Sequence, residues 1–166
     1  TAVTVNPIPV APTAGSNSAI CAGQNLNLTA STITGATYSW TGPNGFTNAT
    51  QNPSITSATT AATGTYSVTA TVNGCTGPAG TTAVTVNPIP VAPTAGSNSP
   101  ICTGNTINLN SNTVINATYN WTGPNSFSAS VQNPTISNAN LSNSGTYSLS
   151  VTVNGCTSPI SSTVVT

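Results

Sequence analysis

The chain contains no Lys, Arg, Asp, Glu or His among its 166 residues. General acid–base catalysis at neutral pH relies mainly on these side chains, and without them a Ser or Thr nucleophile has no base to activate it. Carboxylate and imidazole metal sites are excluded for the same reason, as is nucleic-acid binding through Lys or Arg. We therefore predict a protein that is not an enzyme, uses no cofactor and binds no nucleic acid.

Long apolar segments and C-x-x-C pairs are also missing. No apolar run approaches the ~20 residues of a transmembrane helix, so we predict no membrane insertion. There is no signal peptide or initiator Met, which we interpret as a mature protein or an internal fragment. The spacing of the cysteines argues against a zinc site and for structural disulfides in an oxidising, extracellular compartment; they are Cys21, Cys75, Cys102 and Cys156.

Thr, Ser and Asn are abundant and together supply 76 of the 166 residues. Val and Ile are frequent as well, whereas disordered chains are usually rich in charge and poor in β-branched residues. The composition therefore predicts a folded β protein. Because an uncharged surface lacks long-range repulsion, it also favours association of the molecules side by side.

An internal repeat organises the whole sequence. Shifting residues 1–81 by 81 positions onto residues 82–162 gives 49 identities without a gap, and the segment TAVTVNPIPV occurs at both 1–10 and 82–91. The period exceeds that of helical solenoids and is close to the size of a sandwich domain. We expect one repeat over residues 6–86, a second over 87–166, and further copies of the same repeat as the main partners.

Residues 1–5 have the sequence of the last strand of a repeat. We expect them to be that strand of an upstream repeat, or a strand donated to a neighbouring molecule. Within one repeat, period-two alternation predicts strands at 26–28, 38–40, 54–56, 66–72 and 82–86. Asn73-Gly74 predicts a tight hairpin, and residues 87–90, NPIP, a short stiff linker.

An aromatic pair in each repeat indicates the fold. Trp40 followed by Gly64-Thr65-Tyr66 resembles the immunoglobulin pattern, in which a Trp of strand C packs in the core and a Tyr at a strand corner bonds back to the backbone. The pattern recurs as Trp121 and Tyr147. We predict an all-β protein of two tandem immunoglobulin-like β-sandwiches, head to tail, with core residues Trp40, Tyr66, Trp121 and Tyr147.

Five motifs in fixed order carry a narrower resemblance: C-x-G, Y-x-W-T-G-P-N-x-F, Q-N-P-x-I, G-T-Y-S and V-N-G-C-T. They resemble the Ig-like and PKD-like repeats of giant Bacteroidota cell-surface proteins, which are exported by the type IX system and serve as adhesins, gliding-associated filaments or stalks. The resemblance implies an extracellular or bacterial cell-surface location. It also implies a structural repeat of a filament or adhesin stalk, acting as a rigid spacer that assembles into fibres.

The cysteine pairing has two solutions. The resemblance implies one bridge per repeat, Cys21–Cys75 and Cys102–Cys156. However, Cys21 and Cys75 each lie seven residues from the middle of a predicted strand, at opposite ends of the sandwich and roughly 20 Å from its middle. A disulfide tolerates only about 7 Å between Cα atoms. A Cys21–Cys156 bridge between repeats, with the other two cysteines pairing outward, is the alternative, and both pairings stay open.

Two binding functions are alternatives to the structural one. Trp40 and Trp121 could stack on a polysaccharide, although the inward alternation of Tyr-x-Trp favours the core. Phe46 and Phe127 follow a turn and could be exposed. Thr-rich strands could also form an ice-binding face, but sandwich strands are rich in Thr in any case.

Overall fold

The computed structural model describes residues 2–166, which fold into two compact units that meet between Pro88 and Ile89. We call them repeat 1 and repeat 2. The predicted boundary lay two residues earlier, after Val86. Both units consist of β-strands and short 3-10 helices of one turn each, which confirms the all-β class. Within the described part of the chain, no helix is long and apolar enough to span a membrane.

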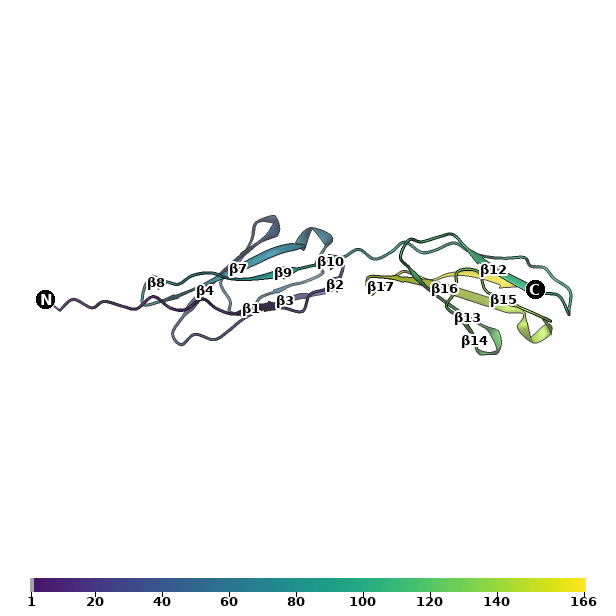
Figure 1. Cartoon of the computed structure of the whole chain (residues 1–166), viewed down its shortest axis with the longest axis horizontal. Helices are drawn as coiled ribbons and strands as arrows, with labels where there is room; N and C mark the ends of the chain where they lie inside the picture. The colour runs from purple at the N-terminus through teal and green to yellow at the C-terminus, as the bar shows by residue number, and fades with distance from the viewer. Residues whose placement is uncertain (1) are drawn as a thin grey trace. The chain divides into compact units, whose positions relative to one another are not determined.

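Repeat 1 is a two-layered sandwich (Figure 1). One sheet has the strand order β1-β3-β6, and the other has the order β5-β4-β7-β8 with β9 also paired to β7. A separate parallel pair joins β10 to β2. The strands are β1 Ala14–Ser16, β2 Ile20–Cys21, β3 Leu26–Ala30, β4 Thr37–Gly42, β5 Phe46–Asn48, β6 Ser54–Ile55, β7 Gly64–Val72, β8 Cys75–Thr76, β9 Gly80–Val84 and β10 Val86–Asn87. The 3-10 turns are η1 Pro43–Gly45 and η2 Thr60–Ala62.

The alternation of side chains explains these strands. In β3, buried residues alternate with exposed ones along the whole strand, and β4 shows the same alternation. Between β7 and β8, Asn73 and Gly74 both have positive φ (49° and 81°), as a type I′ turn requires. This turn brings Val72 opposite Cys75, so the predicted hairpin is confirmed.

Repeat 2 repeats this architecture with sheet orders β11-β12-β15 and β14-β13-β16-β17, β18 being paired to β16. Its strands are β11 Ala95–Ser97, β12 Ile107–Ser111, β13 Thr118–Gly123, β14 Phe127–Ala129, β15 Thr135–Ile136, β16 Gly145–Val153, β17 Cys156–Thr157 and β18 Ser161–Val165. The 3-10 turns are η3 Pro124–Ser126 and η4 Leu141–Asn143.

The segment before β1 is extended and forms no strand in residues 2–13. Thr1, which belongs to the predicted strand 1–5, lies outside the described residues. Val3 and Val5 are 87% and 89% exposed, whereas their sequence counterparts Val84 and Val86 are 2% and 3% exposed at the end of repeat 1. The same residue sequence is therefore core in one place and surface in the other.

Candidate functional site

The two tryptophans are completely buried, each between the sheets of its own repeat. The indole N–H of Trp40 donates to the carbonyl oxygen of Gln51 at 3.1 Å, and that of Trp121 donates to Gln132 at 3.2 Å. Stacking on a sugar needs an exposed ring face. Neither tryptophan offers one, so a polysaccharide site cannot be built on them.

The two tyrosines form corner hydrogen bonds of nearly the same geometry. The Tyr66 hydroxyl donates to the carbonyl oxygen of Ala62, and the Tyr147 hydroxyl donates to that of Asn143, each at 2.9 Å. Burial raises the pKa of both hydroxyls above the ordinary value of 10.0. Both tyrosines therefore stay protonated and serve as structural donors at neutral pH.

The two phenylalanines that follow the 3-10 turns are half-buried. Phe46 packs edge-to-face on Tyr66 with ring centroids 5.5 Å apart, and Phe127 packs in the same way on Tyr147 at 5.4 Å. A hollow of about 300 Å³ borders Phe46, with Pro43, Asn44 and Ile55 also in its wall. The Tyr66 ring also lines this hollow, so two aromatic side chains of repeat 1 border it.

The cysteines of repeat 1 lie at opposite ends of its sandwich. Cys75 pairs with Val72 at one end of β7. Cys21 pairs with Asn87, which follows Val84, the partner of Gly64 at the other end of β7. The eight residue steps between Gly64 and Val72 span roughly 26 Å at ~3.3 Å per residue. The bridge Cys21–Cys75 that the family resemblance implies is therefore wrong for this structure, because a disulfide tolerates only about 7 Å between Cα atoms.

Repeat 2 has the same arrangement. Cys156 pairs with Val153 at one end of β16, whereas Ile101, next to Cys102, donates its N–H to Thr166 beyond the other end. The implied bridge Cys102–Cys156 is wrong for the same reason.

The oxidation states of the four cysteines divide them into two kinds. Cys21 and Cys156 are each part of a disulfide. Cys75 and Cys102 carry free thiols, which corrects the prediction that all four are half-cystines. The opposite placement of the two cysteines in each repeat rules out a bridge within either repeat. Residues 2–166 contain no group of three or more metal-binding side chains.

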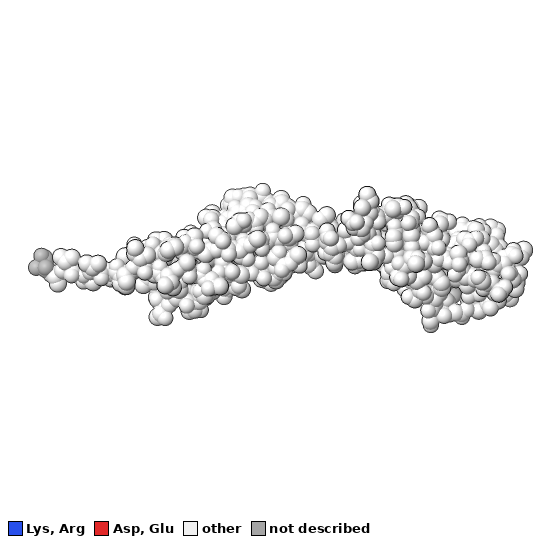
Figure 2. Space-filling view, in the orientation of Figure 1, with Lys and Arg blue, Asp and Glu red and all other residues white. Residues whose placement is uncertain are grey.

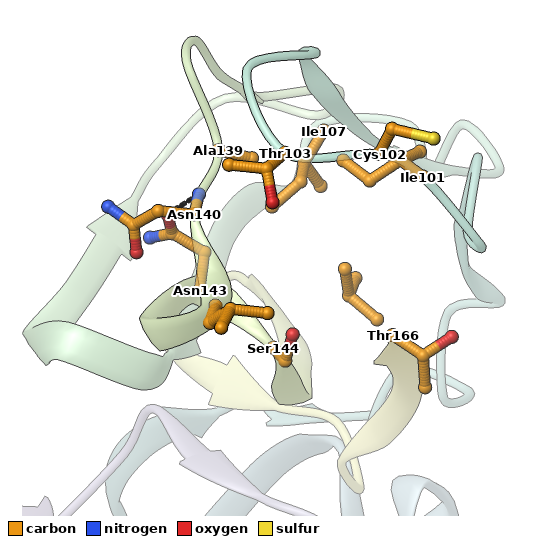
Figure 3. A pocket seen from close by; sticks show the side chains of 11 residues that line it. Ile101, Cys102, Thr103, Ile107, Ala139, Asn140, Asn143, Ser144 and Thr166 are labelled. Atoms are coloured by element: carbon orange, nitrogen blue, oxygen red, sulfur yellow. Dashed lines mark hydrogen bonds between the residues drawn. The ribbon is translucent and has the colours of Figure 1, made fainter.

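A second hollow, of about 50 Å³, lies at the end of repeat 2 where β18 stops (Figure 3). We call it the terminal hollow. Both apolar and polar side chains line it; the apolar ones are Ile101, Ile107, Ala139, Leu141 and Val165, and the others are Cys102, Thr103, Asn140, Asn143, Ser144 and Thr166. Sequence reasoning missed this site.

Solved structures share the fold of the whole chain. A chain from the crystal structure of a mouse coronavirus receptor-binding domain complexed with its murine receptor matches at 14% identity and TM-score 0.56, covering 90% of this chain and 96% of that one. Murine CEACAM1b matches at 14% identity and TM-score 0.53, covering 93% of this chain and 100% of that one. The outer capsid protein Hoc of bacteriophage RB49 matches at 18% identity and TM-score 0.50, covering 93% of this chain and 58% of its three domains.

The comparisons of sequence cover a smaller part of the chain than the comparisons of structure. No curated protein matches the chain. The family model described as "Ig-like domain CHU_C associated" matches residues 9–88. Residues 82–162 share 49 of 81 aligned residues with residues 1–81. Immunoglobulin-like folds of this kind are typically non-enzymatic and act as structural or adhesive extracellular modules. The chain has the immunoglobulin-like fold in both halves, and its repeat 1 is similar to the CHU_C-associated Ig-like domains.

Proposed function

We propose that the chain is a structural repeat of an extracellular filament or adhesin stalk on a bacterial surface, acting as a rigid, uncharged spacer that assembles into fibres. The observation that carries the proposal is the distribution of its side chains. The Trp and Tyr side chains are buried inside the sandwiches, while the surface has no Lys, Arg, Asp or Glu side chain (Figure 2). Such a surface suits contacts between copies better than recognition of a charged ligand.

Association of copies is supported by the absence of net charge and by apolar side chains on the surface. No long-range repulsion keeps uncharged molecules apart. Several large apolar side chains of repeat 2 are more than half exposed and could be covered by a neighbour; they are Ile115, Val131, Leu141, Ile160 and Val164. Side-by-side contacts through these residues and the Thr, Ser and Asn hydroxyls and amides would build bundles.

The cysteines support a covalent link between successive repeats. Cys21 and Cys156 are half-cystines, and neither can reach the other cysteine of its own repeat. We propose that a Cys21–Cys156 bridge spans the junction of the two repeats and stiffens the spacer. Non-reducing peptide mapping tests this directly: a joined pair of peptides carrying Cys21 and Cys75 would contradict it. Elastase is suitable for the digestion, since trypsin has no cleavage site in a chain without Lys or Arg.

Electron microscopy tests the proposed function. We expect the purified chain to form elongated fibres or bundles in negative stain, and light scattering to grow steeply with protein concentration. A particle that stays monomeric at high concentration would contradict the fibre-forming function. The experiment should be repeated at 0.05 M and 0.5 M NaCl, because assembly without ion pairs should not weaken as salt screening increases.

A carbohydrate-binding adhesive function is the second candidate, favoured by the hollow beside Phe46. Its volume of about 300 Å³ is at the lower limit for ligand pockets. A glycan array probed with the purified chain tests this candidate. Binding that is lost in Phe46→Ala and retained in Phe127→Ala would support it.

A further inference from the structure

Strands β2 and β10 of repeat 1 form a parallel pair, in which Val86 lies opposite Ile20 and Asn87 opposite Cys21 (Figure 1). Every other strand pair in the described part of the chain is antiparallel. β10 is also the last strand of repeat 1, and the chain leaves the sandwich directly after it. The parallel pair therefore lies where a pull on the following chain first reaches repeat 1.

The direction of these two strands decides how they respond to a pull along the chain. A pull from both sides of repeat 1 draws β2 back toward β1 and β10 forward toward residue 88. Because the strands run in the same direction, they have to slide past each other, and the hydrogen bonds between them are loaded at the same time. An antiparallel hairpin pulled at its two open ends instead loses its hydrogen bonds one after another.

Three backbone N–H groups hold the parallel pair together. The N–H of Ile20 donates to the carbonyl oxygen of Thr85 at 3.2 Å, and that of Ala22 donates to the carbonyl oxygen of Asn87 at 2.8 Å. The N–H of Thr85 donates to the Ser18 hydroxyl at 2.8 Å. We call residues 18–22 and 85–87 the parallel clamp. All three bonds have to break before its strands can slide apart.

The parallel clamp is also anchored in the core. The side chains of Ile20 and Val86 are 6% and 3% exposed, and the N–H of Val86 donates to the Thr63 hydroxyl at 2.9 Å. Sliding the strands exposes both side chains to water, at a cost that grows with the apolar area uncovered. Repeat 1 therefore resists a pull at this place through apolar packing as well as hydrogen bonds.

A covalent bond begins inside the parallel clamp. Cys21 is part of a disulfide and lies opposite Asn87. If its partner is Cys156, as proposed above, the shortest covalent path along the chain runs from residue 21 directly to residue 156. Residues 22–155 then lie outside that path. They contain strands β3 to β10 of repeat 1 and β11 to β16 of repeat 2.

We propose that the Cys21–Cys156 bond and the parallel clamp together make the chain a spacer that keeps its length under tension. With the bond in place, the pull passes from Cys21 to Cys156 and bypasses both sandwiches. Without the bond, the pull passes through repeat 1 and the parallel clamp bears it. This device rests on the proposed stalk function, because only a stalk between a surface and an attached body is pulled at both ends.

Single-molecule pulling of the full chain, held by peptide tags at its two ends, tests the bypass. The oxidised wild type should lengthen by at most roughly 70 Å, because only residues 14–21 and 156–166 can be drawn out, at ~3.5 Å per residue. Cys21→Ser should give steps of more than roughly 200 Å, because residues 14–87 can then unfold. Steps of the same length in the two chains would overturn the bypass.

Two further variants control this experiment. Cys156→Ser removes the same bond from its other end and should give the same long steps as Cys21→Ser. Cys75→Ser removes a free thiol and leaves the bond intact, so it should lengthen as little as the wild type. Long steps in oxidised Cys75→Ser would show that Cys21 is not bonded to Cys156, and the bypass would be wrong.

Two serines in the Cys21→Ser background test the parallel clamp. Ser18→Ala removes the acceptor of the Thr85 N–H, and Ser54→Ala removes a hydrogen bond of equal length, 2.8 Å, to the Asn27 side chain on the antiparallel β3–β6 pair. At constant force, Ser18→Ala should speed the unfolding of repeat 1 about fivefold, the effect of one ordinary hydrogen bond, and Ser54→Ala should leave the rate unchanged.

Urea unfolding of the same two variants separates a mechanical role from a merely structural one. Each variant loses one hydrogen bond, so the two should lose similar amounts of equilibrium stability. Only the rate under force should distinguish them. Equal rates of unfolding under force for Ser18→Ala and Ser54→Ala would overturn the load-bearing role of the parallel clamp.

Microscopy of the wild-type chain separates this proposal from the function on which it rests. Fibres built from chains that give long steps when oxidised would leave the fibre function standing and overturn the bypass. Short steps in a chain that stays monomeric at high concentration would support the bypass and contradict the fibre function.

Discussion

Repeat 1 and repeat 2 have the same aromatic core but differ at the ends of their strands and in their turns. The Trp and Tyr hydrogen bonds of the two cores agree within 0.1 Å in length. At the strand ends and turns they differ: the Asn140 side chain caps a 3-10 turn of repeat 2, whereas Thr59 at the same place in repeat 1 makes no cap. The comparison teaches that the aromatic core specifies the sandwich, whereas the strand ends and turns can differ from one repeat to the next.

The tryptophans test the shared core and should give the largest effect. Trp40→Ala and Trp121→Ala should each destabilise their own repeat by about 3–5 kcal/mol, because both rings are fully buried. Urea unfolding followed by far-UV circular dichroism measures this, and the remaining Trp reports the other repeat by fluorescence. A difference of more than about 2 kcal/mol between the two variants would break the equivalence of the cores.

Val86 and Val5 have the same sequence neighbours and test whether burial decides the effect of a substitution. Val86→Ser should cost repeat 1 about 1.5–3 kcal/mol, because a nearly buried valine is replaced by a polar side chain. Val5→Ser, in the same sequence context, should stay within about 0.5 kcal/mol because Val5 is exposed. Trp40 fluorescence in a Trp121→Phe background isolates the transition of repeat 1. Equal effects of the two changes would mean that local sequence, not burial, matters here.

Gly80 in repeat 1 and Ser161 in repeat 2 occupy equivalent positions and test a second difference between the repeats. A Cβ on Gly80 would overlap the carbonyl oxygen of Pro12, so Gly80→Ser should destabilise repeat 1 by about 1–3 kcal/mol. At the same position of repeat 2, the hydroxyl of Ser161 is buried and has no hydrogen-bond partner among residues 2–166. Ser161→Ala should therefore stabilise repeat 2 by up to about 1 kcal/mol. Thermal unfolding of the two variants would show opposite signs.

The sequence predicted the core well because each core feature has a local pattern. Alternation placed strands over β3, β4 and β7, and the Asn73-Gly74 turn followed from the need for positive φ. The burial of Trp40 followed from its place in Tyr-x-Trp. These features depend on neighbours within a few residues, which a single sequence displays.

The pairing at the ends of the strands could not be predicted because it depends on contacts between residues that are distant in the sequence. The β2–β10 pair consists of two residues per strand, which is too short for any periodicity. The family resemblance suggested one bridge per repeat, whereas strand counting placed Cys21 and Cys75 at opposite ends, and the structure agrees with the strand counting.

The corner tyrosines test the shared core through pH. Burial raises the pKa of Tyr66 and Tyr147 above 10.0, so the folded chain keeps protons that the unfolded chain loses. Their contribution to stability is fully present below pH 10 and is lost as the pH rises through the folded pKa. We expect a constant melting temperature between pH 3 and 8 and a fall above pH 10, smaller in the double variant Tyr66→Phe, Tyr147→Phe. At pH 7 each single change should cost about 0.5–1.5 kcal/mol. A shift of several degrees between pH 4 and 7 would contradict this.

The smallest expected change in stability concerns the cap of the 3-10 turn that precedes the corner tyrosine. This cap is present in repeat 2 alone among the two equivalent turns. In repeat 2, the Asn140 side chain accepts from the Ser142 N–H and Asn143 bonds back to the Asn140 N–H, whereas Thr59 in repeat 1 makes no such cap. Asn140→Ala should therefore cost repeat 2 about 0.5–1 kcal/mol, and Thr59→Ala should cost repeat 1 almost nothing. The reverse exchange sharpens the test, since Thr59→Asn with Ala62→Asn would create the reciprocal pair in repeat 1. Urea unfolding measures the result. A gain of similar size in the stability of repeat 1 would show that the cap can be moved between repeats without disturbing the core. A loss of stability would show that Ala62, which is nearly buried, is part of the core.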